Sequence, residues 1–137
     1  MREIKFRGKD KQGRWWKGDL RHTMMILGKP HCRIVNVDKD DYDRLQEIWS
    51  YRIQEDTICQ FTSLYDRNKK EIYEGDLLKL QDDDTGLIEV RFVRGVFAFL
   101  WQGDLDDELP INAPTHEWAT VAGNIHDNPE LLKGDEK

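Results

Sequence analysis

The fold class is decided by residues 56–78, whose sequence is DTICQFTSLYDRNKKEIYEGDLL. The polar run 66–69 separates two apolar segments, which is the pattern of a β-hairpin loop. A second turn, Glu74-Gly75-Asp76, precedes an apolar strand over 77–80. The stretch therefore predicts two turns and two strand starts, and it carries no known catalytic motif.

The rest of the chain continues this β pattern on both sides of the central stretch. Alternating apolar and polar residues, rich in β-branched and aromatic types, favour strands over helices. Further strands are expected over 4–7, 14–17, 23–27, 33–37, 48–54, 87–93, 96–101 and 117–122, with a turn of helix over 43–47 left open. Arg94-Gly95 is expected to be a tight turn, 102–116 a long acidic loop, and Asn128-Pro129 the start of a short C-terminal helix.

The predicted fold class is mainly β. Phe99 and Trp101 share one face of the strand 96–101, and its other face is apolar too, so the strand must be covered on both sides. Phe92 is expected in the same core. We therefore predict a small SH3-like barrel over about 61–125, extended by the N-terminal strands.

The length of 137 residues fits a single domain, 1–137, with an N-terminal β lobe over 1–60 and a barrel lobe with the short helix over 61–137. A chain of this size buries about two-thirds of its unfolded surface, so it can build a core without disulfides. Cys32 and Cys59 form no CxxC pair, and the sequence carries no signal peptide or membrane-spanning run. We expect a soluble cytoplasmic protein with reduced thiols and no membrane contact.

Charge is distributed unevenly along the chain. Residues 1–21 hold eight basic and three acidic side chains, so the remainder of a chain with net charge −6 carries −11. Trp15 and Trp16 lie within the basic segment, which pairs phosphate-binding cations with rings on which bases could stack. The predicted surface for nucleic acid or a partner consists of Lys9, Lys11, Arg14, Trp15, Trp16 and Lys17.

Three ordered motifs stand out along the chain. They are Ile4-Lys5-Phe6-Arg7, the segment from Thr57 to Asp66 that leads into Lys70-Glu71-Ile72-Tyr73-Glu74-Gly75-Asp76, and the closing segment Gly123-Asn124-Ile125-His126-Asp127-Asn128-Pro129-Glu130-Leu131. Together they resemble the motifs of YopX-like proteins, which are found in bacteriophages and prophages. The resemblance implies a small, mainly β, phage-associated protein with no established catalytic residues. The motif residues Gly75, Asp76, Gly123, Asn128 and Pro129 are expected to shape the backbone.

The chain departs from the family pattern at two turn positions. Family members usually carry glycine where this chain has Ser63 and Lys69, and glycine makes a positive φ inexpensive. Asn68 is expected to take part of that role, because asparagine tolerates the left-handed region.

Catalytic and metal chemistry find little support in the residue spacing. His22, His31, Cys32, Cys59, His116 and His126 do not show the paired spacing of a zinc site. In the acidic loop, Leu109 and Thr115 stand where an EF-hand needs glycine and glutamate, so only a looser ion site remains open there. With many carboxylates, a glycosidase-type pair also stays open. We expect no catalytic residues, no cofactor and no metal.

The sequence thus predicts a non-enzymatic protein-interaction module whose partner is an unknown protein or a second copy of the chain. Exposed tryptophans would be its natural anchors. Nucleic-acid binding through the basic N-terminal segment is the alternative.

Overall fold

The computed structural model describes residues 3–23, 31–39, 45–80, 86–109 and 115–133, and it is mainly β, as predicted. The chain forms two compact units, residues 1–61 and 62–137, and β5 (Cys59–Tyr65) runs through the boundary between them. The predicted lobes divide one residue earlier. Among the described residues, no helix combines the length and apolar character needed to cross a bilayer.

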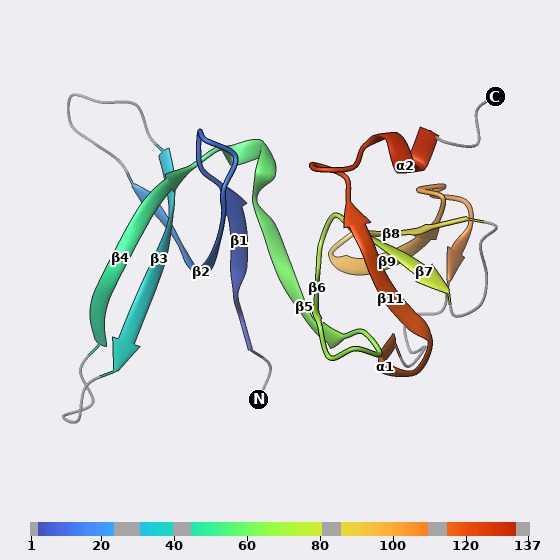
Figure 1. The fold of residues 1–137 in the computed structure, drawn as a ribbon, viewed down its shortest axis with the longest axis horizontal. Coiled ribbons are helices and arrows are strands. Elements are labelled where there is room, and N and C mark those ends of the chain that lie inside the picture. The colour runs from blue at the N-terminus through green and yellow to red at the C-terminus, as the bar shows by residue number, and fades with distance from the viewer. Residues whose placement is uncertain (1–2, 24–30, 40–44, 81–85, 110–114, 134–137) are drawn as a thin grey trace. The chain divides into compact units, whose positions relative to one another are not determined.

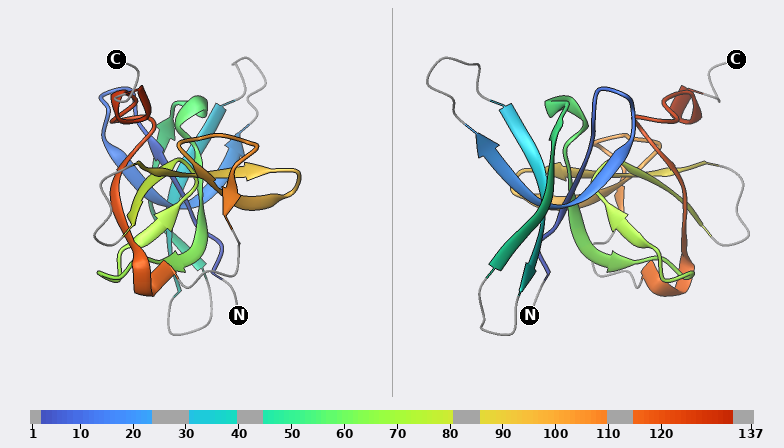
Figure 2. Two further views of the ribbon diagram at one scale, coloured as in Figure 1. Left: turned by 90° about the vertical axis from the view of Figure 1, so that its right-hand side faces the viewer. Right: turned by 60° about the vertical axis from the view of Figure 1, so that its left-hand side comes forward.

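The N-terminal unit is an antiparallel sheet whose strands are ordered β4-β3-β2-β1-β5. β2, β3 and β4 are long strands that form a twisted ribbon (Figures 1 and 2). Beyond β4, the N–H of Gln54 donates to the carbonyl of Lys9, which brings that end of the ribbon back to β1. The strands are β1 (Phe6–Lys9), β2 (Trp15–Thr23), β3 (His31–Lys39) and β4 (Leu45–Ile53), and the short 3-10 helix η1 (Glu55–Thr57) follows β4.

One side of this sheet is apolar and forms the core of the N-terminal unit. Cys32, Ile34 and Ile53 are buried there, and four partly buried hydrophobic residues, Phe6, Trp16, Leu20 and Ile58, pack against them. Successive strand residues point to opposite faces, so the intervening residues of β1 and β2 lie on the other side of the sheet.

The C-terminal unit contains a second antiparallel sheet, ordered β10-β9-β8-β7-β11. β11 lies beside β7 and leads towards the helix α2 (Figure 1). Its elements are β6 (Glu71–Tyr73), which pairs with β5, then β7 (Asp76–Leu80), β8 (Ile88–Val93), β9 (Val96–Trp101), β10 (Glu108–Leu109), α1 (Thr115–Trp118), β11 (Ala119–Asn124) and α2 (Glu130–Lys133).

The middle of β9 is buried on both faces, which confirms the prediction for this strand. Phe99 is 2% exposed on one face, while Ala98 and Leu100 are fully buried on the other. Phe99 belongs to the main core of this unit, together with Ile72, Leu78, Ile88, Val90 and Ala119. That this unit is an SH3-like barrel stays a prediction.

Phe92 was wrongly predicted to be in the core, because its side chain is 47% exposed. The residue lies near the end of β8, beside the turn that links β8 to β9, where the sheet runs out. Its ring instead makes an edge-to-face contact with Phe97, at 5.1 Å between ring centroids. Apolar alternation identified the strand correctly, but it could not show where coverage of the strand stops.

Several predicted boundaries needed correction. The first two strands begin later than expected and β2 continues to Thr23, while residues 24–27 of the third predicted strand lie outside the described residues. Of the possible helical turn over 43–47, residues 45–47 belong to β4 and are not helical, while residues 43–44 lie outside the described residues. The predicted loop 102–116 contains β10, which pairs with β9, and the strand expected from 117 begins only at Ala119, after α1.

The positive-φ positions expected from the family pattern are confirmed. Ser63 and Lys69 have φ values of 68° and 65°, so each residue occupies a conformation in which glycine is less strained. Asn68 is not among the positive-φ residues, so the expectation that it shares the role was wrong. Arg94 and Gly95 both have positive φ, as a two-residue type I′ hairpin turn requires.

The remaining motif residues shape the backbone of the C-terminal unit. Gly75 has a φ of 88°, and the carboxylate of Asp76 accepts a hydrogen bond from the N–H of Tyr73 across the turn. A Cβ at Gly123 would lie 2.5 Å from Oδ1 of Asn128, so glycine here permits a close approach. That oxygen accepts a hydrogen bond from the N–H of Asn124, and α2 begins at Glu130, just after Pro129.

Candidate functional site

The residues of the predicted basic surface divide between the two faces of the N-terminal sheet. In the β1–β2 register, Lys9 lies opposite Trp15 and Arg7 lies opposite Lys17, so these four side chains share the face away from the apolar core. Trp16 points to the other face and packs against the core. The expectation that both tryptophans form one platform was therefore wrong, because adjacent strand residues cannot share a face.

Trp15 is held between cations. The guanidinium carbon of Arg7 lies 4.8 Å from the Trp15 ring centroid and the ammonium of Lys9 lies 5.3 Å from it, both within cation–π range. Arg7 is buried and Trp15 is half-buried. The Trp15 ring is thus already engaged by its neighbours, which leaves it as a rigid part of a charged surface.

Trp16 is fixed by a second set of contacts. Its ring stacks on Tyr51 with centroids 3.8 Å apart and planes 10° apart, and the Arg14 guanidinium carbon lies 5.7 Å from the Trp16 ring centroid. The Trp16 indole N–H donates to Oδ2 of Asp10 over 3.0 Å. This cluster ties the loop between β1 and β2 to β4.

Asp10 organises that loop. Its carboxylate accepts hydrogen bonds from the Trp16 indole, from the side chain and N–H of Arg14, and from the N–H of Gln12. These bonds, led by that from Trp16, lower the pKa of Asp10 from 3.8 to about 2. Asp10 is therefore ionised at neutral pH, and its ion pair with Arg14, at 2.9 Å, offsets the charge of that arginine.

Three arginines lie side by side across β2, β3 and β4. Arg21 pairs with Arg33 in the β2–β3 register, and Arg33 pairs with Arg52 in the β3–β4 register. Arg33 is anchored by two hydrogen bonds, from its Nε to the hydroxyl oxygen of Ser50 and from its Nη2 to the carbonyl oxygen of Ser50. The donor–acceptor distance is 3.0 Å in each. The row therefore places three positive charges next to one another on one side of the sheet.

The arginine row and the charged side of β1 and β2 form one surface. Strand alternation along β2 places Lys17 and Arg21 on the same side of the sheet, so the row continues that charged side, and we call the whole surface the basic face. The basic face consists of Arg7, Lys9, Lys17, Arg21, Arg33 and Arg52, with Trp15 among them.

Sequence reasoning missed Arg33 and Arg52. Both lie in strands that the sequence predicted, but outside the dense basic segment before residue 22, which alone indicated a charged surface. The available signal was the alternation of each arginine with apolar neighbours, which predicts a solvent-facing position. Their alignment depends on the register of three strands, which the spacing of residues in the sequence does not reveal.

The two units also differ in charge. Residues 1–61 hold 13 basic and 10 acidic side chains, a net charge of +3. Residues 62–137 hold 8 basic and 17 acidic side chains, a net charge of −9. An anionic ligand is therefore attracted to the N-terminal unit, and a cationic ligand to the C-terminal unit.

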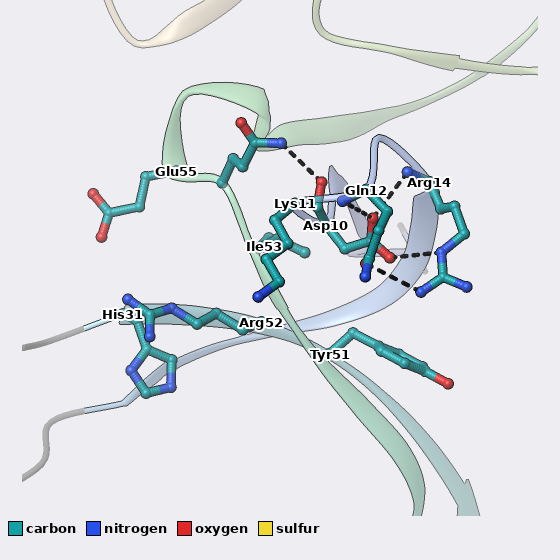
Figure 3. Close-up of a pocket in the computed structure, with 10 residues that line it drawn as sticks. Asp10, Lys11, Gln12, Arg14, His31, Tyr51, Arg52, Ile53 and Glu55 are labelled. Carbon is teal, nitrogen blue, oxygen red and sulfur yellow. Dashed lines mark hydrogen bonds and ion pairs between the residues drawn. The ribbon is translucent and has the colours of Figure 1, made fainter.

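A pocket of about 550 Å³ lies in the N-terminal unit (Figure 3). Lys11 and Arg14, from the predicted surface, belong to its wall, and Arg52 joins it to the basic face. The pocket is lined by Asp10, Lys11, Gln12, Arg14, His31, Tyr51, Arg52, Ile53, Gln54 and Glu55.

The cysteine and histidine residues do not assemble into a metal centre within the described part of the chain, where no three potential ligands are grouped. Cys32 and Cys59 are both buried, and neither is joined in a disulfide in the described part of the chain. The Cys32 sulfur lies 3.3 Å from Nδ1 of His22, and burial raises the pKa of the Cys32 thiol. A raised pKa keeps this thiol protonated, in the form that is a poor nucleophile.

Comparisons with known proteins support a family assignment. The structure is similar to the crystal structure of protein EF1440 from Enterococcus faecalis, with a TM-score of 0.60, 23% identity, and coverage of 96% of this chain and 99% of that chain. At this identity the similarity shows a shared fold. No curated protein matches the sequence. The family model described as YopX protein matches residues 5–133, nearly the whole chain, and the chain therefore belongs to the YopX family.

Proposed function

We propose that this protein is a non-enzymatic binding module that recognises an acidic surface of a protein partner through the basic face. The observation that carries this proposal is the alignment of Arg21, Arg33 and Arg52 at one register across three strands. This arrangement concentrates positive charge on one side of the sheet, so an acidic surface of a partner is attracted to it and is held in a defined register.

The basic face is also well prepared for binding. The hydrogen bonds between Arg33 and Ser50 fix the central guanidinium, and the packing of Arg7 and Lys9 against Trp15 fixes the neighbouring cations. Side chains that are already ordered lose less conformational entropy when a partner binds. Asp19, which lies between Lys17 and Arg21 along β2, is exposed and provides an acceptor for a basic residue at the edge of the contact.

Nucleic-acid binding is the second candidate, and the positive charge of the N-terminal unit favours it. Phosphate contacts by Lys9, Lys11 and Arg14 would make such binding weaken steeply with salt. The tryptophan rings count against it, because Arg7 and Lys9 engage Trp15 and Tyr51 stacks on Trp16, whereas single-stranded binding relies on accessible rings. Protein recognition is therefore the better supported of the two.

The family resemblance supports a proposal for where the protein acts. Because YopX-like proteins are associated with phages and prophages, we propose that the protein and its partner act in the cytoplasm of a bacterial host. The opposite charges of the two units also support self-association, with the basic face of one copy against the acidic unit of another.

Affinity capture with the full-length chain tests the proposal. The test variant is Lys17→Glu/Arg21→Glu, which reverses two exposed charges on the basic face. The matched control is Arg67→Glu/Lys70→Glu, which reverses two exposed charges in the β5–β6 hairpin loop. Host-cell extract, with and without nuclease treatment, is passed over each immobilised protein, and the bound proteins are identified by mass spectrometry.

We expect a nuclease-resistant protein partner that the wild type and the control retain and the basic-face variant loses. A partner retained equally by all three proteins contradicts the proposal. Material that nuclease removes favours the second candidate, and capture of the chain itself, with a concentration-dependent mass in solution, favours self-association.

A further inference from the structure

We infer that the pocket of the N-terminal unit binds a nucleotide, with the phosphate between Lys11 and Arg52 and the base beside Tyr51. The volume of about 550 Å³ is in the range of small-molecule sites and is far larger than a single carboxylate or phosphate would fill. This inference does not depend on the partner of the basic face being a protein, because the pocket is a separate concavity that shares only Arg52 with that face.

The phosphate end of the pocket is formed by two cations from different elements. Figure 3 shows Lys11 extending from the loop between β1 and β2 towards β4, while the guanidinium of Arg52 extends towards His31. Within the described part of the chain, neither Lys11 nor Arg52 has an ion pair, and both are exposed. Their charges are therefore available to a ligand, and an ammonium with a guanidinium is a common phosphate-binding set.

The other charged groups in the pocket sharpen this assignment. Arg14 is paired with Asp10, so these two charges offset each other. Glu55 lies on the η1 side of the pocket and stands apart from the Asp10–Arg14 pair (Figure 3). A carboxylate there disfavours a ligand that is anionic throughout and favours one with hydroxyl or amino donors as well, which a nucleoside supplies.

The ring of Tyr51 forms one wall of the pocket, which is also lined by the amide side chains of Gln12 and Gln54. Stacking on Trp16 holds the Tyr51 ring in place, which gives the pocket a fixed aromatic wall. Nε2 of Gln54 donates to the carbonyl of Asp10 at a distance of 2.8 Å, which holds the loop against η1. An aromatic wall in a pocket that is also lined by amides suits a heterocyclic base, which offers a π-face and an edge of donors and acceptors.

Isothermal titration calorimetry with the full-length chain tests the inference. The probes are adenosine monophosphate, uridine monophosphate, adenosine, inorganic phosphate, a short single-stranded oligonucleotide with or without a 5′-phosphate, and a glutamate-rich peptide. We expect both mononucleotides to bind about tenfold more tightly than adenosine or phosphate, because each of those probes makes only half of the contacts. If the oligonucleotide binds more tightly with its 5′-phosphate than without it, the ligand is the end of a nucleic-acid strand. If the free mononucleotides bind and the oligonucleotides do not, the ligand is a free nucleotide.

Three variants locate the site. Lys11→Gln and Arg52→Gln should each weaken mononucleotide binding about tenfold, and Tyr51→Leu should weaken it for mononucleotides but leave binding of phosphate unchanged. The control Lys17→Gln removes an exposed cation outside the pocket and should change the affinity less than twofold. Lys11 and Arg52 are exposed, so their variants should retain the wild-type circular dichroism spectrum.

The inference is overturned if no mononucleotide binds, if phosphate alone binds as tightly as the mononucleotides, if the glutamate-rich peptide occupies the pocket in their place, or if Lys17→Gln weakens binding as much as Arg52→Gln. Mononucleotide binding retained by the Lys17→Glu/Arg21→Glu variant separates this site from the basic face, whatever the outcome of the capture experiment.

Discussion

Oδ2 of Asp66 accepts a hydrogen bond, at a distance of 3.0 Å, from the backbone N–H of Val121, a residue 55 positions further along the chain. The other carboxylate oxygen of Asp66 accepts from the N–H groups of Asn68 and Lys70 within the hairpin loop. One buried side chain, 2% exposed, thus shapes a turn and fastens it to β11. The residue that the sequence predicts to shape a local turn therefore also makes a long-range contact.

Replacing Asp66 should therefore be costly. In Asp66→Asn one oxygen can still serve the turn, but an amide N–H₂ then faces the N–H of Val121, so two donors oppose each other in a buried place. We expect a loss of about 2–3 kcal/mol in the free energy of unfolding, measured by urea denaturation. The control is Asp104→Asn, because the Asp104 carboxylate accepts a hydrogen bond from the N–H of Asp106 in an exposed turn, and this variant should lose less than about 1 kcal/mol. Equal losses in the two variants would show that the contact with Val121 contributes nothing.

Glycine at Lys69 should stabilise the protein. The φ of 65° places this residue in the left-handed region, which costs a side chain about 1–2 kcal/mol, while glycine loses more entropy on folding. The net gain expected for Lys69→Gly is about 0.5–1 kcal/mol, visible as a higher urea midpoint with an unchanged slope. Lys70→Gly is the control, since Lys70 is equally exposed and lacks a positive φ, and it should be neutral or destabilising. A loss of stability in Lys69→Gly would count against strain at this turn.

The two aromatic residues Phe99 and Phe92 should respond very differently to truncation. Phe99→Ala opens a cavity in the core of the C-terminal unit and should cost about 3–5 kcal/mol. Phe92→Ala removes a half-exposed ring and should cost about 1 kcal/mol or less. The difference is measured by thermal or urea denaturation of the two variants side by side. Similar losses would mean that the end of the β8–β9 hairpin is covered in solution.

Asp10 gives the N-terminal unit a stability that depends on pH. Hydrogen bonds, first of all from the Trp16 indole, lower the pKa of Asp10 to about 2 in the folded chain, below the ordinary 3.8. A lowered pKa means that this contribution is fully present above about pH 4 and is lost as the pH falls towards 2. The stability difference between wild type and Asp10→Asn should therefore be largest near neutral pH and shrink between about pH 4 and 2. A difference that stays constant over this interval would show that the charge of Asp10 does not matter.

The sequence predicted those features that depend on neighbouring residues. Local turn chemistry predicts the hairpin loop 66–69 and the turn at Arg94-Gly95, while the strained positions Ser63 and Lys69 follow from the comparison with the family pattern. The exposed position of Phe92 and the dual role of Asp66 do not, because both depend on elements distant in the sequence.

The same division applies to the candidate site. Lys9, Trp15 and Lys17 were predicted as surface residues, but the separation of Trp16 from Trp15 follows only once both are placed in one strand. The row formed by Arg21, Arg33 and Arg52 depends on the pairing of three strands, which residue spacing does not reveal.

The measurement that tests the central claim most directly is the NMR footprint of the captured partner on the full-length, isotope-labelled chain. If the basic face is the binding surface, the largest chemical-shift changes will fall on β1, on Trp15 to Arg21 of β2, and on the strand residues around Arg33 and Arg52. Changes confined to β7, β8, β9 and β11, with those residues unaffected, would contradict the assignment of binding to the N-terminal unit.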